Sequence, residues 1–119
     1  MLVHTGGVDE LIQTGVATIG ELVSGDVRVY EFDARDVGIQ RVSLDALGGG
    51  SPDFNAAITR SILAGEDVPA RVDAVALTAA AALYAADAAP SIREGVELAR
   101  QAMRNGAALA KLGALIAFH

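Results

Sequence analysis

The hydrophobic pattern of the chain changes at the glycine triplet of residues 48–50. Before the triplet, β-branched residues and turn residues dominate, which is typical of short strands joined by tight connections. After it the chain is rich in alanine, and apolar residues recur at helical spacing. The pattern predicts a β-rich half over residues 1–50 and a helical half over residues 51–119. Together they form one small domain, or a fragment of one, of the α/β or α+β class.

The first half contains one predicted hairpin. Residues 18–23 and 27–32 both favour an extended chain, and Ser24-Gly25-Asp26 lies between them. A short connection that contains glycine, placed between two such runs, predicts an antiparallel pair of strands. We therefore expect a small, partial sheet in this half.

Three helices of the second half have recognisable start residues. Ser51 precedes Pro52, a proline at the first helical position, where its missing N–H group costs nothing. Pro69 marks a second start. Ser91 and Glu94 have the spacing of a capping box, in which each residue satisfies a free N–H group of the other. We expect helices to begin near residues 52, 69 and 91, and a last helix over residues 107–117 to follow the third with only a slight bend.

The second helix carries an apolar stripe made by Val72, Val75, Ala79 and Leu83. Its remaining faces are rich in alanine, so it presents little polar surface to water. This pattern predicts that this helix is the most buried of the three.

Composition narrows the possible functions. Fifteen acidic residues against nine Lys and Arg give a formal net charge of −6, and no basic stripe is present, so we expect no binding to nucleic acid. The chain has no cysteine, which excludes disulfides and thiolate chemistry. The uncharged run of residues 74–86 is shorter than the roughly 20 residues that span a membrane. Since no secretory signal opens the chain, we expect a cytoplasmic protein with no membrane partner.

One short segment carries candidate chemistry. Residues 2–4 are interpreted as the end of a buried strand, and Gly6 and Gly7 then let the backbone turn tightly and approach a ligand closely. Two adjacent carboxylates, Asp9 and Glu10, come next. Mg²⁺ prefers oxygen ligands and is usually held by one or two carboxylates together with substrate phosphates. An adjacent acidic pair is more often solvated surface, so spacing alone leaves both interpretations open.

The ordered set of segments resembles anthranilate phosphoribosyltransferase, an enzyme of tryptophan biosynthesis. The resemblance begins with Val3-His4 and Gly7-Val8-Asp9-Glu10-Leu11, where an Asp-Glu pair follows a glycine and an aliphatic residue. It continues in the same order through residues 25–30, 47–49, 55–58, 63–65, 79–84, 94–99 and 106–112. The resemblance places the chain in the carboxyl-terminal portion of that family, whose fold is a parallel-rich α/β domain joined to a helical domain.

This resemblance implies a function for the acidic pair. In the family, the pair holds the Mg²⁺ ions that accompany the diphosphate of phosphoribosyl pyrophosphate, whose phosphoribose is transferred to the amine of anthranilate. Asp9 and Glu10 are therefore implied to bind Mg²⁺, with phosphoribosyl pyrophosphate and anthranilate as substrates. No other residue matches a functional position of the family. Its phosphate loop and anthranilate-binding region precede the matched portion, so we expect little or no transferase activity from the chain alone.

Three further residues require comment. Ile12 stands where the family commonly has a small hydroxyl residue, and Thr78 stands where asparagine is usual. The first difference bears on the geometry of the metal loop, and the second on helix packing. His4, at the end of a strand, is interpreted as structural rather than as a ligand or base.

The alternative function is a non-catalytic interaction module from a truncated or split gene. A portion cut from a larger α/β domain exposes strand edges and apolar helix faces, which favour pairing with another chain. We therefore expect a homo-oligomer, or association with a complementing amino-terminal portion.

Overall fold

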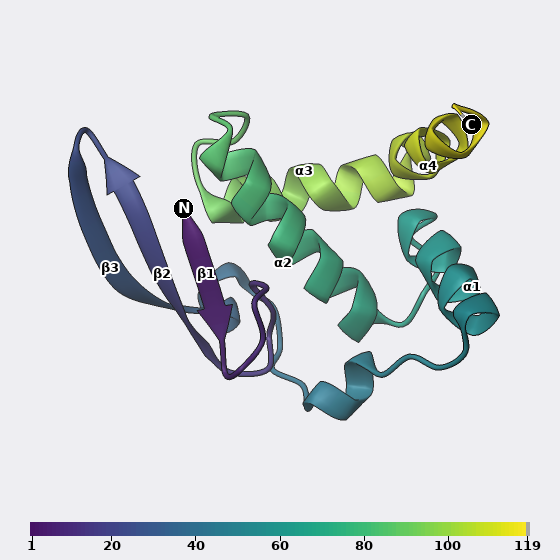
Figure 1. Cartoon of the computed structure of the whole chain (residues 1–119), viewed down its shortest axis with the longest axis horizontal. Helices are drawn as coiled ribbons and strands as arrows, with labels where there is room; N and C mark the ends of the chain where they lie inside the picture. Colours follow the sequence, from purple (N-terminus) through teal and green to yellow (C-terminus); the bar gives the residue numbers. More distant parts are fainter. Residues whose placement is uncertain (119) are drawn as a thin grey trace.

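A computed structural model describes residues 1–118. Over these residues a three-stranded sheet lies at one end of the molecule and four α-helices at the other (Figure 1). The strands are β1 (Leu2–Thr5), β2 (Val16–Val23) and β3 (Asp26–Asp33), and the helices are α1 (Pro52–Leu63), α2 (Pro69–Ala85), α3 (Ile92–Arg104) and α4 (Ala107–Ala117). Two 3-10 turns, η1 (Ala34–Val37) and η2 (Leu44–Leu47), lie between β3 and α1. The predicted fold class, with a partial sheet followed by helices, is confirmed.

The predicted hairpin forms through a two-residue turn. Ser24 and Gly25 adopt φ angles of 51° and 92°. Positive φ at both central residues is the type I′ geometry, whose twist matches that of paired strands. β2 pairs with β3 on one side and with β1 on the other, and both pairs are antiparallel. The matched family implied a parallel-rich domain, but within residues 1–118 no parallel pair occurs, because short turns and loops rather than crossover helices join the strands.

One face of the sheet belongs to the core. Ala17 and Ile19 of β2 are buried in one cluster with Leu77 and Ala80 of α2 and Val96 of α3. The opposite face of the sheet, within the described part of the chain, is covered by no helix. Leu2 lies on that opposite face and is 81% exposed, so the interpretation of residues 2–4 as a buried strand is wrong for this chain. The strand forms, but only one of its faces is covered.

The serine caps predicted for α1 and α3 both form. The Ser51 Oγ accepts a hydrogen bond from the Phe54 N–H, and the Ser91 Oγ accepts one from the Glu94 N–H. The Glu94 carboxylate accepts a hydrogen bond from the Ser91 hydroxyl. The Glu94 carboxylate thus bonds the Ser91 hydroxyl and not the Ser91 N–H group, so the predicted capping box forms only on its serine side.

The last helix does not continue α3 with a slight bend. Gly106 adopts a φ of 81° between the two helices. Figure 1 shows α3 lying across the view while α4 is seen end-on, so the chain turns sharply at this residue. A left-handed conformation reverses the local path of the backbone and ends a helix instead of bending it.

The predicted stripe of α2 is not its most buried face. Val72, Val75, Ala79 and Leu83 are half-buried, whereas Ala76, Leu77 and Ala80 are fully buried. Five of the 17 residues of α2 are buried and four are exposed, whereas α3 buries five of 13 and leaves six exposed, so α2 is the least exposed of the three predicted helices. A helix that is apolar on all sides gives no pattern by which to choose its inner face.

Candidate functional site

The acidic pair lies in the loop between β1 and β2, which opens with a tight turn. The Thr5 N–H donates to the Val8 carbonyl at 2.9 Å, and the Val8 N–H donates to the Thr5 carbonyl at 3.0 Å. Gly6 and Gly7 occupy the two central positions with φ angles of 52° and 93°. Two consecutive positive φ angles favour glycine at both positions. The glycine pair therefore reverses the chain directly after β1.

His4 belongs to this turn. Its Nε2 accepts a hydrogen bond from the Gly7 N–H at 3.1 Å. This contact ties the His4 ring to the backbone of the glycine turn. The contact supports the interpretation of His4 as a structural residue.

Thr5 holds the backbone around the acidic pair from inside. The side chain is fully buried, and its hydroxyl donates to the Glu10 carbonyl at 2.9 Å. The same oxygen accepts the Ile12 N–H at 3.4 Å. One buried hydroxyl thus contacts the main chain at Glu10 and two residues beyond it.

Helix α2 holds the far side of the loop. The Thr78 hydroxyl donates to the Leu11 carbonyl at 3.1 Å. The amide of the fully buried Gln13 donates to the Ala70 carbonyl at 2.6 Å. Leu11 is also completely buried. The segment after the acidic pair is therefore fixed to α2 at two points, although neither contact could be read from sequence spacing.

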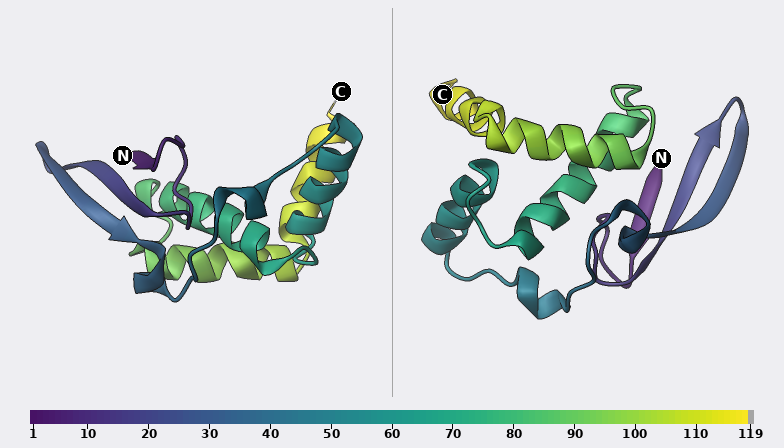
Figure 2. Two further views of the ribbon diagram at one scale, coloured as in Figure 1. Left: turned by 90° about the horizontal axis from the view of Figure 1, so that it is seen from below. Right: turned by 180° about the vertical axis from the view of Figure 1, so that it is seen from behind.

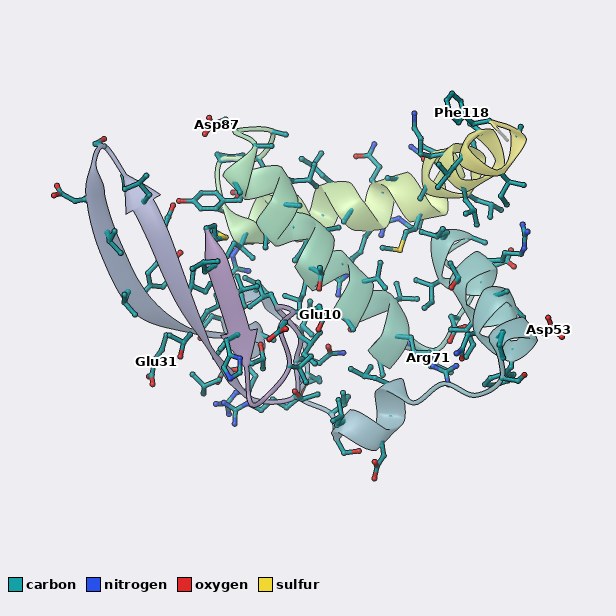
Figure 3. The ribbon with its side chains drawn as sticks, in the orientation of Figure 1. Glu10, Glu31, Asp53, Arg71, Asp87 and Phe118 are labelled. Carbon is teal, nitrogen blue, oxygen red and sulfur yellow. The ribbon has the colours of Figure 1, made fainter. Side chains whose placement is uncertain are left out.

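The two carboxylates themselves face outward. Asp9 and Glu10 are exposed, and within residues 1–118 their side chains have no ion-pair or hydrogen-bond partner. In Figure 3 the Glu10 side chain lies between the end of β1 and α2. Over the same residues, no group of three or more His, Cys, Asp or Glu side chains could enclose a metal ion. The chain offers two free carboxylates on a loop whose backbone is hydrogen-bonded to Thr5 and Thr78. This donor set suits Mg²⁺, which keeps several waters and takes further oxygens from a phosphate.

Ile12 and Thr78 help to form the surroundings of Glu10. Together with Glu10, both line an open apolar hollow of about 460 Å³ on the surface, against the half-buried face of α2. Ile12 gives this hollow an apolar wall. Thr78 also holds the acidic loop, so it does more than pack between helices, the role expected from the sequence.

A second polar cluster joins the sheet to α2. The Glu21 carboxylate accepts hydrogen bonds from the Tyr30 hydroxyl at 3.0 Å and from the Tyr84 hydroxyl at 2.7 Å. Burial, together with Glu21, raises the pKa of Tyr30 to about 12. The hydrogen bond to Glu21 also raises the pKa of Tyr84. The two tyrosines act here as donors that dock the sheet on the helix.

Comparison with known proteins identifies the family to which the fold belongs. The family described as glycosyl transferase family, a/b domain, matches residues 1–109. The chain belongs to this family.

Among the helices of residues 1–118, none is long and apolar enough to cross a membrane.

Within the family, the chain is similar to anthranilate phosphoribosyltransferase, which confirms the resemblance stated above. It is 47% identical over 118 residues to the enzyme of Roseiflexus castenholzii, with 98% of this chain and 35% of the relative covered. It is 41% identical over 116 residues to the enzyme of Methanocorpusculum labreanum, with 98% and 34% covered. The chain thus spans about a third of the length of the relatives that it matches.

Solved structures of anthranilate phosphoribosyltransferase are also similar to this chain. The crystal structure of anthranilate phosphoribosyltransferase from Thermus thermophilus superposes with a TM-score of 0.88 at 42% identity, covering 98% of this chain and 34% of that one. The Saccharomyces cerevisiae enzyme, in complex with 4-fluoroanthranilate, gives a TM-score of 0.82 at 20% identity over 93% of this chain and 33% of that one. The second comparison shows the shared fold.

Proposed function

We propose that this chain provides the Mg²⁺–diphosphate part of an anthranilate phosphoribosyltransferase site. In this proposal, Asp9 and Glu10 bind Mg²⁺ that accompanies phosphoribosyl pyrophosphate, and anthranilate is the acceptor substrate. The observation that carries the proposal is the contrast within one loop. Its backbone is held by Thr5 and Thr78, while its two adjacent carboxylates are exposed and unpaired within residues 1–118.

This contrast is what a metal-diphosphate site requires. Bound Mg²⁺ would neutralise charge on the pyrophosphate leaving group. The contribution of the chain is to hold two carboxylate oxygens in place before the ligand arrives, so that little ordering is needed on binding. An acidic pair on a mobile surface loop would lack this property.

The chain alone is proposed to bind the metal-diphosphate unit without turning over substrate. Transfer of phosphoribose depends on holding two substrates in line, which is worth several orders of magnitude in rate. The chain covers about a third of the length of its relatives, and the family resemblance implies a functional role only for the acidic pair. Turnover of anthranilate and phosphoribosyl pyrophosphate by the purified chain would contradict this part of the proposal. In the cell, the expected compartment is the cytoplasm.

Calorimetry tests the binding proposal. Phosphoribosyl pyrophosphate is titrated into the chain with and without Mg²⁺, and the titration is repeated on Asp9→Asn/Glu10→Gln. We expect heat of binding only with Mg²⁺ and only for the native pair, because the metal needs charged oxygen ligands. Binding that the double substitution leaves unchanged, or absence of binding at every Mg²⁺ concentration, would refute the proposal.

A matched control separates the pair from general loss of charge. Asp53→Asn/Asp87→Asn removes the same two negative charges from exposed residues of the α1 start and of the loop after α2. Figure 3 shows both residues on elements away from Glu10. The control should bind like the native chain. Equal weakening in both variants would show that binding follows net charge alone.

An interaction module is the second candidate function, and exposed apolar surface favours it. Leu2, Leu22 and Val27 of the sheet are each more than two-thirds exposed. Leu115 and Ile116 of α4 are more than half exposed, and α4 has no fully buried residue. Such surfaces mark sites of association with another polypeptide. The homo-oligomer and the complementing amino-terminal portion are the two partners proposed.

A further inference from the structure

Helix α2 has one apolar side that is only partly covered within residues 1–118. On another side α3 packs so closely that Gly95 of α3 lies against Ala80. Figure 2 shows this pair of helices in the middle of the molecule, with the strands at one end and α1 and α4 at the other. A helix that is apolar on all sides is normally buried on all sides. The partly covered side of α2 therefore indicates a neighbour that residues 1–118 do not supply.

Two open hollows meet on the partly covered side of α2. The first, of about 460 Å³, lies beside the acidic loop, and the second, of about 550 Å³, lies between α2 and α3. Both are lined by Val75, Ala79 and Ala82, so they form one continuous groove, which we call the α2 groove. Leu98 and Met103 of α3 line its far wall.

We propose that the α2 groove is the surface on which the remainder of the family's fold docks, namely the part of an anthranilate phosphoribosyltransferase that this chain does not span. The proposal rests on the family assignment and deepens the second candidate function, because it names the docking surface and the kind of partner. It does not depend on metal binding by Asp9 and Glu10.

The family comparison indicates what occupies the groove. The chain is matched over nearly its whole length but spans only about a third of its relatives. It superposes closely on part of the Thermus thermophilus enzyme, so α2 and α3 have the same arrangement within a larger chain. The rest of such a chain is large enough to cover the groove. Covering it is favourable, because apolar surface left in water costs free energy in proportion to its area.

The chemistry of the groove fits a polypeptide surface. All ten residues that line the second hollow are apolar, and five of them are alanines. Small side chains at a contact let a neighbouring element approach closely. A small ligand would instead be held by a few convergent polar groups, and Glu10 and Thr78 line only the first hollow. The partner should therefore present a mainly apolar surface, with polar groups only toward the acidic loop.

Co-expression of two polypeptides tests the proposal, with no metal or substrate added. This chain carries the affinity tag, and the second polypeptide is the part of the Roseiflexus castenholzii enzyme that the chain does not match. We expect the two to purify as one complex in size-exclusion chromatography. Ala82→Glu/Leu98→Glu should lower the recovery of the second polypeptide about tenfold or more, because it buries two carboxylates in an apolar contact.

The fold of this variant can be checked separately. Ala82 and Leu98 are exposed in their helices, and glutamate is a good helix former. The circular dichroism spectrum of the isolated variant should therefore equal that of the native chain. Ala110→Glu/Leu115→Glu is the matched control, since it makes the same two changes at exposed residues of α4. It should leave the recovery of the second polypeptide unchanged.

Three outcomes would overturn the proposal. The second polypeptide could remain unbound or insoluble beside the native chain, the groove substitutions could leave its recovery unchanged, or the α4 substitutions could lower it equally. Because this assay needs no metal and the calorimetric test uses the chain alone, loss of docking and loss of metal-diphosphate binding are distinguished.

Discussion

Gly95 lies where α3 crosses α2, and a side chain at this position has no room. A Cβ built on Gly95 would lie 2.9 Å from the Ala80 Cα, 2.9 Å from the Ala80 carbonyl oxygen and 3.0 Å from its Cβ. Gly95 and Ala80 are both buried, and the nearest atoms belong mainly to backbone. Backbone atoms in the middle of a helix cannot rotate away as the end of a flexible side chain can. The Gly95→Ala variant therefore has to move the two helices apart.

Two opposing effects decide the sign of the change in stability. Alanine is favoured over glycine within a helix by about 1 kcal/mol. Carbon atoms in contact lie about 3.5–4.0 Å apart, so the helices would have to separate by roughly 0.5–1 Å, which forfeits a quarter to a half of the local dispersion energy. Overpacking of this kind costs about 1–3 kcal/mol. Because the clash is with backbone, we place the cost at the upper end and expect a net destabilisation of about 1–2 kcal/mol.

Urea denaturation followed by circular dichroism measures this change. Gly113→Ala is the matched control, since Gly113 lies in α4, is exposed, and has no atom within 4 Å of an added Cβ. The control should be stabilised by about 0.5–1 kcal/mol through helix propensity alone. One substitution is thus expected to have opposite effects at two helical sites. A Gly95→Ala protein as stable as the native chain, or more stable, would refute the close contact between α2 and α3.

Two other predictions concern polar groups. Thr5→Val should lower the free energy of unfolding by about 1–3 kcal/mol, because the Glu10 carbonyl loses its buried donor. It should also weaken Mg²⁺-dependent binding in calorimetry, and unchanged affinity would show that Thr5 does not position the acidic loop. Since the folded protein raises the pKa of Tyr30 to about 12, the unfolded chain loses this proton first as the pH rises. Stability should be full below pH about 10 and fall between about 10 and 12. A tyrosinate absorbance titration in which Glu21→Gln does not lower the highest midpoint would contradict the role of Glu21.

Much of the fold could be predicted from interactions between residues that are close in sequence. The hairpin turn, the Ser51 cap and the Ser91 cap depend on atoms a few residues apart, so their side-chain chemistry could be read directly from the sequence. The turn at Gly106 shows what local residues do not determine, namely the direction of the helix that follows. Asn105-Gly106 marked the end of a helix, but the direction of the next helix depends on a φ of 81° and on packing partners elsewhere.

The inner face of α2 could not be predicted for a different reason. Alanine and valine surround the helix, so the sequence offers several equivalent faces. The choice is made by the neighbours, namely Gly95 against Ala80 and the sheet against Leu77. The exposed face of the three-stranded sheet was not predicted either, because residues 2–4 were interpreted as part of a buried strand.

The acidic pair of the candidate site was predicted from the sequence, but the residues that hold its loop were not. Asp9 and Glu10 were found from the glycine turn and from family resemblance. The residues that hold their loop were not, because Thr5 acts through a buried hydroxyl and Thr78 lies 67 residues from its acceptor Leu11. A threonine in a helix is ordinarily a surface or packing residue, and only the fold brings this one to the loop.

The central claim is that Asp9 and Glu10 bind a divalent cation together with a diphosphate. The most direct measurement is an NMR titration in which Mn²⁺, which prefers the same oxygen ligands as Mg²⁺, is added with phosphoribosyl pyrophosphate. The account predicts that paramagnetic broadening is strongest for the amides of residues 6–11 and for Thr78, and that Asp9→Asn/Glu10→Gln removes it. Broadening centred on Asp53 or Asp87, or broadening that persists in the double variant, would contradict the account.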